Sequence, residues 1–405
     1  MSLKMKSERS WGRLGMKYEW KIKTVGELTS YISKGIPPKY TDKKTNSTIV
    51  VLNQKCNRDY KISYEQSRLH DTTKKAVPTD KVLQYGDVLI NSTGTGTAGR
   101  IAQFFNNDIS TTVDGHMIIM RASKEIDYLY YGYALKSYQK KIESFAEGST
   151  GQTEINKQRL QEELLIKYPQ NIDLQRSIAL ILKNIDDKIE LNNRINENLE
   201  SQAQAIFKSW FVDFEPFGGV MPEDWKITTL GEISEMSAGG DKPRNATEIP
   251  TTENTVPIYS NGISNEGLYG FTDKAKVVEE SVTVSARGTI GYVCLRQTPY
   301  VPIVRLITIV PKASIVSAKY IYLQLKTINI SGTGTTQQQL TVPNFKSTEL
   351  LMPNIAVVNK FTSIVNPMFE KIKDNKIENQ RLSALRDALL PKLMNGEIDV
   401  SKVKI

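Results

Sequence analysis

The stretch "WKIKTVGEL" at residues 20–28 returns as "WKITTLGEI" at residues 225–233, and this repetition determines how the chain is organised. Further pairs follow in the same order along the chain: "TAGRI" (97–101) with "TIGYV" (289–293), "YYGYALKS" (130–137) with "YIYLQLKT" (320–327), and "ELLIKYP" (163–169) with "ELLMP" (349–353). The period far exceeds the roughly 20–50 residues of a solenoid repeat. The sequence therefore predicts two copies of a whole domain, each with the helix that follows it.

Each copy begins with a β-rich part. Apolar, β-branched runs bounded by turn residues predict strands at "TIVVL" (48–52), "DVLI" (87–90), "HMIIMR" (116–121), "SVTV" (281–284) and "IVRLITIV" (303–310). An amphipathic helix follows in each copy, predicted over 127–145 and 318–328. Their tyrosine stripes are interpreted as core packing and not as a base-stacking platform, because aromatic faces of helices are readily buried.

A long polar helix closes each copy. The first is predicted over 171–212 and the second over 358–390, with Pro391 stopping the second and Pro367 bending its first turns. Both carry a narrow apolar seam close to heptad spacing. Two asparagines interrupt each seam, at matching places: Asn192 and Asn196 in the first, Asn375 and Asn379 in the second.

Two narrow seams of similar length are expected to pack against each other, since independent surface helices would each leave a seam exposed. Buried asparagines would then fix the register at some cost in stability. The predicted fold is α+β: two β-rich domains, each followed by a long helix, with the two helices packed as an antiparallel coiled coil. The duplication gives the chain an internal pseudo-two-fold organisation.

Composition narrows the class of protein. The 405 residues are too many for one ordinary core, and the net charge of +9 favours an anionic partner, of which nucleic acid is the commonest. The two cysteines and two histidines, Cys56, Cys294, His70 and His116, exclude a disulfide scaffold and a zinc cluster and are expected in the core or on the surface. We expect no membrane association and a cytoplasmic location, because no apolar run approaches the ~20 residues of a membrane span.

The stretch "NSTGTGTAGR" (91–100) fits the G-x-G-x-x-G pattern of a nucleotide or S-adenosylmethionine site. That fingerprint needs a helix after the glycines, whereas "RIAQFF" (100–105) alternates like a strand. The second copy carries "SARGTIGYV" (285–293) without the full pattern. We therefore interpret both stretches as tight turns between strands.

The stretch "IPPKY" (36–40) also falls short of a catalytic motif. Adenine methyltransferases place Asp, Asn or Ser before Pro-Pro and an aromatic residue after it to hold the flipped base, and here Ile36 and Lys39 occupy those positions. We assign no catalytic, cofactor-binding or metal-binding residue to this chain.

Loops suited to DNA remain. "GSTGQTEINKQR" (148–159) and "SGTGTTQQQL" (331–340) combine small residues with amide, hydroxyl and basic groups. Gln or Asn can bond adenine, Arg can bond guanine, and Lys can hold phosphates. The alternative for any one of these residues is a solvated loop side chain. The candidate DNA-binding residues on these and other loops are Lys55, Arg58, Lys61, Thr95, Arg100, Gln152, Lys157, Arg159, Arg244, Arg287, Gln337 and Gln338.

Two further stretches, "AIFKSWFVDFEP" (205–216) and "ALLPKLMNGEI" (388–398), close the two long helices. They resemble the signatures of the specificity (S) subunit of type I restriction–modification systems, and the resemblance extends from about Trp20 to the end of the chain. It implies a target recognition domain at 17–170, a central conserved helix at 171–216, a second recognition domain at 217–355, and a C-terminal conserved helix and tail at 356–405. Residues 1–16 are an N-terminal arm or a non-native sequence.

The resemblance implies a non-catalytic function. Members of the family read the two halves of a split double-stranded DNA target with two recognition domains, held apart by an antiparallel helix pair. They recruit two methyltransferase (M) subunits, which use S-adenosylmethionine to methylate adenine, and two restriction (R) subunits, which use ATP and Mg. The chain itself is then expected to hold no cofactor. Because the loops of the two copies differ, an asymmetric bipartite target is expected.

Two alternatives stay open at this point. The chain could be an S-adenosylmethionine-dependent DNA adenine methyltransferase in its own right, which binding of S-adenosylmethionine by the purified chain would reveal. It could also be a coiled-coil scaffold that binds no DNA, which retention on duplex DNA with a steep salt dependence would contradict.

Overall fold

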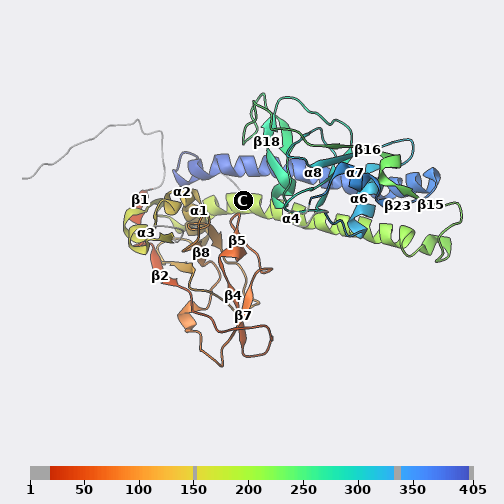
Figure 1. Ribbon diagram of the computed structural model, residues 1–405. Helices are drawn as coiled ribbons and strands as arrows, with labels where there is room; N and C mark the ends of the chain where they lie inside the picture. Colours follow the sequence, from red (N-terminus) through yellow and green to blue (C-terminus); the bar gives the residue numbers. More distant parts are fainter. Residues whose placement is uncertain (1–18, 149–152, 333–338, 401–405) are drawn as a thin grey trace, which may run out of the picture. The chain divides into compact units, whose positions relative to one another are not determined.

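A computed structural model describes residues 19–148, 153–332 and 339–400 (Figure 1). Contacts divide the chain into two compact units, Met1–Ile189 with Gln380–Ile405, and Glu190–Asn379. Each unit holds one β-rich domain together with segments of the long helices α4 (Ile172–Phe211) and α8 (Ile355–Met394). We call the β-rich part of the first unit domain 1 and that of the second unit domain 2.

Domain 1 is built on two four-stranded sheets and a ribbon. The first sheet is antiparallel, in the order β2 (Thr29–Lys34), β11 (Met117–Ala122), β8 (Val88–Asn91) and β9 (Ile101–Gln103). The second has the order β10 (Thr111–Val113), β4 (Thr48–Leu52), β7 (Arg68–Asp71) and β3 (Tyr40–Thr41), with β10 and β4 parallel. The ribbon pairs β1 (Trp20–Thr24) with β14 (Leu165–Pro169). Two shorter antiparallel pairs complete it: β5 (Asn57–Arg58) with β6 (Lys61–Ile62), and β12 (Ala146–Glu147) with β13 (Glu154–Ile155).

Domain 2 repeats this plan. Its main sheet has the order β16 (Ser234–Ala238), β22 (Ile307–Pro311), β19 (Ser281–Val284) and β20 (Val293–Arg296). Its second sheet has the order β18 (Leu268–Thr272), β17 (Val256–Tyr259) and β21 (Val301–Pro302), with β17 and β21 parallel. Its ribbon pairs β15 (Lys226–Thr229) with β23 (Glu349–Met352). The main sheets and ribbons have the same strand order in both domains, and the second sheets share three strands, with β3 added in domain 1. This agreement confirms the duplication predicted from the sequence.

The helices complete each domain. Domain 1 carries α1 (Tyr128–Ser137), α2 (Gln139–Glu143) and α3 (Lys157–Glu163), and domain 2 carries α5 (Leu230–Ile233), α6 (Ala318–Thr327) and α7 (Val342–Lys346). The tyrosine stripes of α1 and α6 lie in the cores, as predicted: Tyr130, Tyr131 and Tyr320 are each 0% exposed. The hydroxyl of Tyr130 donates to the carbonyl of Lys167 at 2.9 Å, and that of Tyr320 donates to the carbonyl of Leu351 at 2.8 Å. The same bond ties helix to ribbon in both domains.

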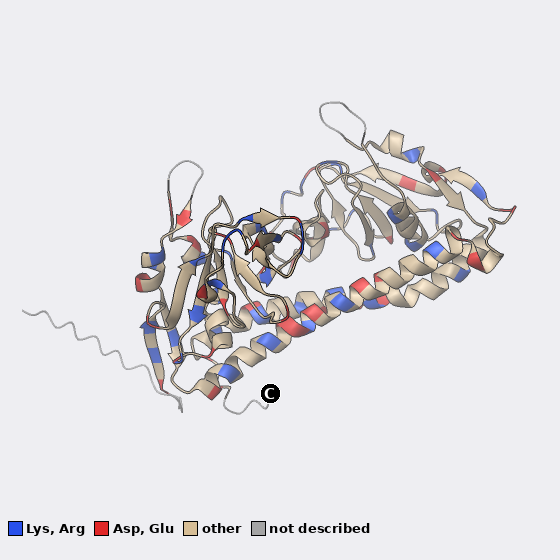
Figure 2. Ribbon diagram, turned by 90° about the horizontal axis from the view of Figure 1, so that it is seen from below, with Lys and Arg blue, Asp and Glu red and all other residues tan. Residues whose placement is uncertain are grey.

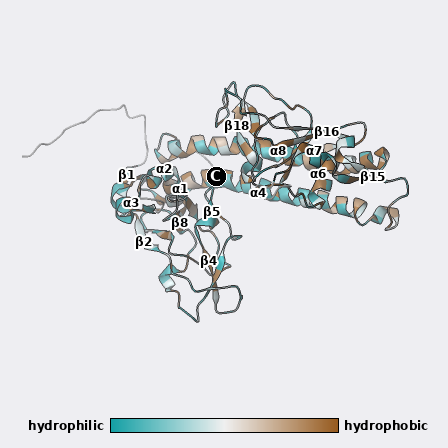
Figure 3. Cartoon of the chain, viewed as in Figure 1, coloured by the Kyte–Doolittle hydropathy of each residue, from teal (hydrophilic) through white to brown (hydrophobic). Residues whose placement is uncertain are grey.

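The two long helices pair antiparallel. In the second unit, Asn192 Nδ2 donates to Asn379 Oδ1 at 2.9 Å, and Asn375 Nδ2 donates to Asn196 Oδ1 at 2.8 Å. Residue numbers rise along α4 as they fall along α8, so the helices are antiparallel. Asn192 of α4 corresponds to Asn375 of α8, and Asn196 to Asn379, so the pseudo-two-fold symmetry of the repeat exchanges the two bonds. Asn192 is 0% and Asn375 is 1% exposed. The predicted asparagine contacts and the antiparallel coiled coil are confirmed, and Figure 3 shows how hydrophilic and hydrophobic residues alternate along both helices.

In the first unit the helix segments are joined by charge. Arg386 Nη1 of α8 donates to Asp186 Oδ1 of α4 at 2.8 Å. From α1, the Tyr133 hydroxyl donates to Asp186 Oδ2 at 2.8 Å, and Lys136 Nζ lies 3.4 Å from the same oxygen. Asp186 therefore holds domain 1 and both helix segments together.

Four boundaries predicted from the sequence are wrong. The helix α8 runs past Pro391 to Met394, because Pro391 removes only one backbone bond while Leu393 and Met394 are buried in the core of the first unit. The predicted helix 127–145 divides at Tyr138 into α1 and α2. The predicted strand 303–310 begins only at Ile307, since a loop holds residues 303–306. Part of the predicted loop 148–159 is helical, because Asn156 caps α3 by accepting from the backbone N–H groups of Gln158 and Arg159.

Candidate nucleic-acid interface

The glycine-rich stretch of domain 1 forms a turn between β8 and β9. Gly94, Gly96 and Gly99 have φ of 111°, 70° and 86°, a region that favours glycine. A Cβ on Gly99 would lie 2.8 Å from Glu143 Cα, so the turn packs directly on the backbone of the last residue of α2. The strands on either side are paired, with Ile90 opposite Ile101. The predicted strand–turn–strand arrangement is confirmed.

Polar side chains from three loops meet beside this turn. Gln54 Nε2 donates to Thr93 Oγ1 at 2.8 Å, and Thr93 Oγ1 lies 2.9 Å from His116 Nδ1. A backbone bridge also joins Thr93 to Glu154, next to the loop that precedes β13. Segments far apart in the sequence are thus gathered at one end of the main sheet.

A groove of about 470 Å³ adjoins this cluster, and its lining contains both donors and acceptors. The guanidinium carbon of Arg68 lies 3.6 Å from the centre of the Tyr40 ring, so the ring holds this cation in place. Asp114 is 6% exposed, and burial raises the pKa of its carboxyl. The groove is lined by Tyr40, Asn53, Gln54, Lys55, Glu65, Gln66, Ser67, Arg68 and Asp114.

Domain 2 has a corresponding end. Arg287 lies in its turn and donates from Nη2 to Gln339 Oε1 at 2.9 Å. Asn261 links this turn to a second loop: its Oδ1 accepts from the backbone N–H of Ala286 at 2.8 Å, and its Nδ2 donates to the carbonyl of Val304 at 2.6 Å. Chemically, exposed donors held by a fixed backbone can bind base edges or phosphates.

Comparison with known proteins identifies the family. Residues 17–201 and 222–385 match the family described as Type I restriction modification DNA specificity domain, once for each copy of the repeat. The chain belongs to this family. It is a type I restriction–modification specificity subunit, in agreement with the resemblance seen in the sequence.

Relatives match over nearly the whole length of this specificity subunit. It is 26% identical to the Type I restriction enzyme MjaIX specificity subunit of Methanocaldococcus jannaschii, over 95% of each chain. It is 24% identical to the Type I restriction enzyme HindI specificity subunit of Haemophilus influenzae, over 94% of this chain and 100% of the relative. The crystal structure of a type I S subunit from M. genitalium shares the fold, with a TM-score of 0.57 at 20% identity, over 94% of this chain and 97% of that one.

Several predicted DNA-binding residues of the specificity subunit lie at or beside the turn of domain 1. Thr95 is in the turn, Lys55 lines the groove, and Arg100 follows the turn and donates to the carbonyl of Gly96 at 3.0 Å. Arg58 and Lys61 instead face each other across the β5–β6 pair. The tip of that pair points toward α1, because the Tyr60 ring centre lies 4.4 Å from Lys136 Nζ.

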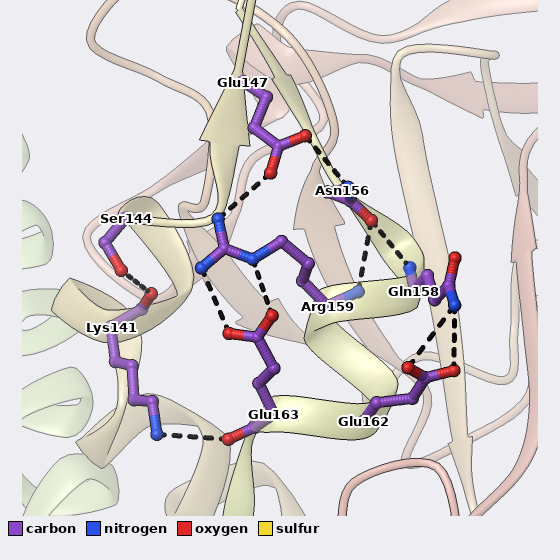
Figure 4. A network of polar contacts seen from close by, with 8 residues as sticks. All are labelled: Lys141, Ser144, Glu147, Asn156, Gln158, Arg159, Glu162 and Glu163. Atoms are coloured by element: carbon purple, nitrogen blue, oxygen red, sulfur yellow. Dashed lines mark hydrogen bonds and ion pairs between the residues drawn. The ribbon is translucent and has the colours of Figure 1, made fainter.

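The predicted residues Lys157 and Arg159 lie on α3 and not on a loop. Figure 4 shows Arg159 between two carboxylates: Glu147 at 3.0 Å and Glu163 at 2.8 Å. Bonding to Glu163, and then to Glu147, raises the pKa of the Arg159 guanidinium. The charge of Arg159 is therefore balanced within domain 1 itself.

In domain 2, Arg244 and Arg287 are exposed on loops, as expected. Gln152, Gln337 and Gln338 lie outside the described residues. The sequence did not single out Gln54, Arg68, Asn261 or Arg305 as DNA-binding, and it expected His116 only in the core or on the surface. None of the five belongs to a motif, and Arg305 lies inside a predicted strand.

Two further observations limit the chemistry. Among the described residues, no group of three or more His, Cys, Asp or Glu side chains is arranged to hold a metal ion. No helix in the described part of the chain is both long enough and apolar enough to cross a membrane. Figure 2 shows basic and acidic residues interspersed along both long helices.

Proposed function

We propose that this chain reads a bipartite double-stranded DNA target, with one half bound by domain 1 and the other by domain 2. One observation carries the proposal: the same backbone framework occurs twice, but its loops present different side chains. Thr93 and His116 lie at the end of domain 1 where domain 2 presents Arg287. Different donors and acceptors on one framework are what two different half-sequences require.

Charge supports binding to DNA. The net charge of +9 attracts an anionic polymer, and exposed arginines and lysines lie on the loops described above. Phosphate contacts would supply affinity and orientation, while side chains at base edges would supply sequence specificity.

The helix pair is proposed to set the spacer between the half-sites. Each long helix has 40 residues, which corresponds to roughly 60 Å at ~1.5 Å per residue. Two related domains on one side of B-DNA require half-site centres about one turn, ~34–36 Å, apart. Removing one heptad from both helices keeps the apolar seams in phase and shortens the pair by about 10 Å. The spacer should then shorten by up to about 3 base pairs while both half-sequences stay the same.

The chain is proposed to act without catalysing a reaction itself. Its relatives are named specificity subunits of type I restriction enzymes. We propose that it recruits two methyltransferase subunits, which bind S-adenosylmethionine, and two restriction subunits, which bind ATP and Mg. Two buried, unpaired cysteines, Cys56 and Cys294, are compatible with the reducing cytoplasm proposed for the complex.

The decisive experiment expresses the chain with its cognate methyltransferase subunit and maps methylated adenines across a genome. A split motif with a spacer of fixed length is expected, and the absence of any split motif would refute the proposal. Binding of S-adenosylmethionine by the purified chain alone would instead favour the alternative, a DNA adenine methyltransferase in its own right.

A further inference from the structure

Backbone hydrogen bonds align the strand ends on either side of the turns in the two domains. In domain 1, Asn91 N–H donates to Arg100 and Gly99 N–H to Asn91, at 3.0 and 2.9 Å. In domain 2, Ser285 N–H donates to Tyr292 and Gly291 N–H to Ser285, each at 3.0 Å. Asn91 therefore corresponds to Ser285. The alignment continues by one residue, because the carbonyl of Ser92 accepts from Ile155 N–H at 2.7 Å and that of Ala286 from Leu340 N–H at 3.0 Å. Counted from this side, the next residues, Thr93 and Arg287, correspond, and the turn of domain 2 is two residues shorter beyond them.

A second loop aligns in the same way. Asp114 N–H donates to Leu52 at 3.0 Å in domain 1, and Ile303 N–H donates to Tyr259 at 2.9 Å in domain 2. Three residues later, Met117 N–H donates to Asp114 at 3.1 Å and Leu306 N–H to Ile303 at 3.0 Å. His116 and Arg305 therefore occupy the same position on their loops.

Thr93 and His116, which touch in domain 1, are thus both replaced by arginine in domain 2. Asn261 connects the two arginine-bearing loops, because it bonds the backbone of Ala286 on one and of Val304 on the other. Arg287 and Arg305 are each the next residue along. One asparagine side chain consequently fixes the backbone from which both arginine side chains extend.

The loop that carries Arg305 is held in a strained conformation. Val304 and Arg305 have φ of 51° and 60°, which residues with a side chain rarely adopt, β-branched ones least of all. Backbone bonds impose this shape: Val304 N–H donates to Gly240 at 2.8 Å and Arg305 N–H to Gly239 at 2.9 Å. Such strain persists where the surrounding structure fixes it, and it concentrates at functional sites.

Both arginines are exposed, and neither forms an ion pair within the described part of the chain. Gln339 occupies one N–H group of Arg287, which leaves the rest of its planar fork for a ligand. An arginine whose charge is unbalanced and whose backbone is fixed suits the O6 and N7 atoms of guanine, which accept two parallel hydrogen bonds.

We propose that Arg287 and Arg305 read guanine in the half-site bound by domain 2, and that Asn261 is the residue that positions them. Thr93 and His116, at the same two positions of domain 1, then read the other half-site. This inference rests on the proposed function, and it names the residues that make the two half-sequences different.

The test compares methylation motifs of complexes that carry single substitutions. Arg305→Gly removes the guanidinium while relieving the left-handed backbone, so the variant is expected to fold at least as well as the parent chain. Arg287→Ala removes the other guanidinium, and Arg305→Lys keeps the charge but loses the fork. Arg381→Ala is the matched control, because it removes an exposed arginine from the segment of α8 that belongs to the first unit.

Each of the three loop variants should lose discrimination at guanine positions of one half-site, with methylation of mismatched sites rising roughly 5- to 150-fold. Thr93→Ala should alter the other half only, and Arg381→Ala should leave the motif unchanged. An unchanged motif in Arg305→Gly and Arg287→Ala would overturn the inference. So would a uniform loss of affinity with a weaker salt dependence, which indicates phosphate contacts. Absence of a split motif with the parent chain would instead refute the proposed function.

Discussion

Replacing Asp186 with alanine should weaken the first unit, because this carboxylate joins α1, α4 and α8. Asp186 accepts from the Tyr133 hydroxyl and from Arg386, each at 2.8 Å, and it lies 3.4 Å from Lys136. The substitution would leave Lys136 without a carboxylate and Arg386 with only Asp387, which lies 2.8 Å from its Nη2. The side chains of Lys136 and Arg386 are only 10% and 18% exposed, so water can compensate them only in part.

The size of the effect follows from this burial. Breaking a fully buried ion pair by removing one partner costs about 3–5 kcal/mol. The Asp186 side chain is 28% exposed, which places the expected loss near the lower end, at about 2–3 kcal/mol. For a unit of 150–250 residues this corresponds to a fall in Tm of roughly 4–12 °C.

The neighbouring residue offers a matched control. In the described part of the chain Asp187 forms an ion pair with Lys183, one helical turn away, and its side chain is 57% exposed. Asp187→Ala should cost less than about 0.5 kcal/mol. Thermal unfolding followed by circular dichroism, with hydrogen exchange of α1 and of the end of α8, would compare the two variants. Equal stability of the two variants, or a loss confined to the second unit, would refute the role given to Asp186.

Three other predictions can be checked by unfolding measurements, the last of them together with methylation mapping. Burial raises the pKa of Asp186, but the charges of Lys136 and Arg386 outweigh burial and hold this pKa below its usual 3.8. The stability that ionised Asp186 contributes should therefore be complete above pH 3.8 and be lost as the pH falls through the lower pKa of the folded state. Asp186→Ala should abolish this loss. Gly96→Ala should cost about 1 kcal/mol of stability, because φ is 70° but the space around a new Cβ is open. Gly99→Ala should cost about 2–4 kcal/mol, because its Cβ would also meet the Glu143 backbone at 2.8 Å. Similar Tm values for the two variants would contradict this. Among the described residues the Oδ1 atoms of Asn192 and Asn375 have no hydrogen-bond partner. Replacing both asparagines with leucine should therefore raise stability by about 1–2 kcal/mol. If these residues fix the register of the helix pair, methylation mapping of this variant should show more than one spacer length.

Much of the fold could be predicted because its signals are local or repeated. Alternating apolar residues placed strands at 48–52 and 281–284, which the structure has as β4 and β19. The narrow apolar seams of the two long helices predicted that the helices pair, and the matched asparagines predicted polar contacts that fix the register of the pair. The repeat also removed a false reading: a single G-x-G-x-x-G match gave way to a turn between β8 and β9 once its counterpart at 285–293 was considered.

The failures arose where distant residues decide the local structure. The stretch 303–310 is rich in β-branched residues and interrupted by only one charged residue, Arg305, which predicts one strand. The structure breaks it at Val304 and Arg305, because their N–H groups bond to Gly240 and Gly239, more than sixty residues away in the sequence. No local propensity favours a left-handed valine, so the loop that carries Arg305 could not be found from the sequence.

The candidate site was predicted in kind but not in detail. Basic and amide residues on loops were expected, and Arg287 and Arg244 are on loops. Arg159 has the same residue type, but Glu147 and Glu163 balance its charge. Glu163 lies four residues after Arg159, a spacing that brings two side chains together only within a helix, and the helix α3 became apparent only with its N-cap Asn156. Distinguishing a balanced arginine from an unbalanced one requires the fold.

The exchange symmetry of the asparagine contacts has a consequence for how such chains can change. Asn192 with Asn379 and Asn375 with Asn196 are one contact used twice, so the pairing surface is isologous. A surface of this kind accepts any second half that carries the same helix edge, whatever loops its domain presents. A gene for one half would thus encode a chain able to pair with itself, and joining two unlike halves would create a new combination of loops without redesigning the seam.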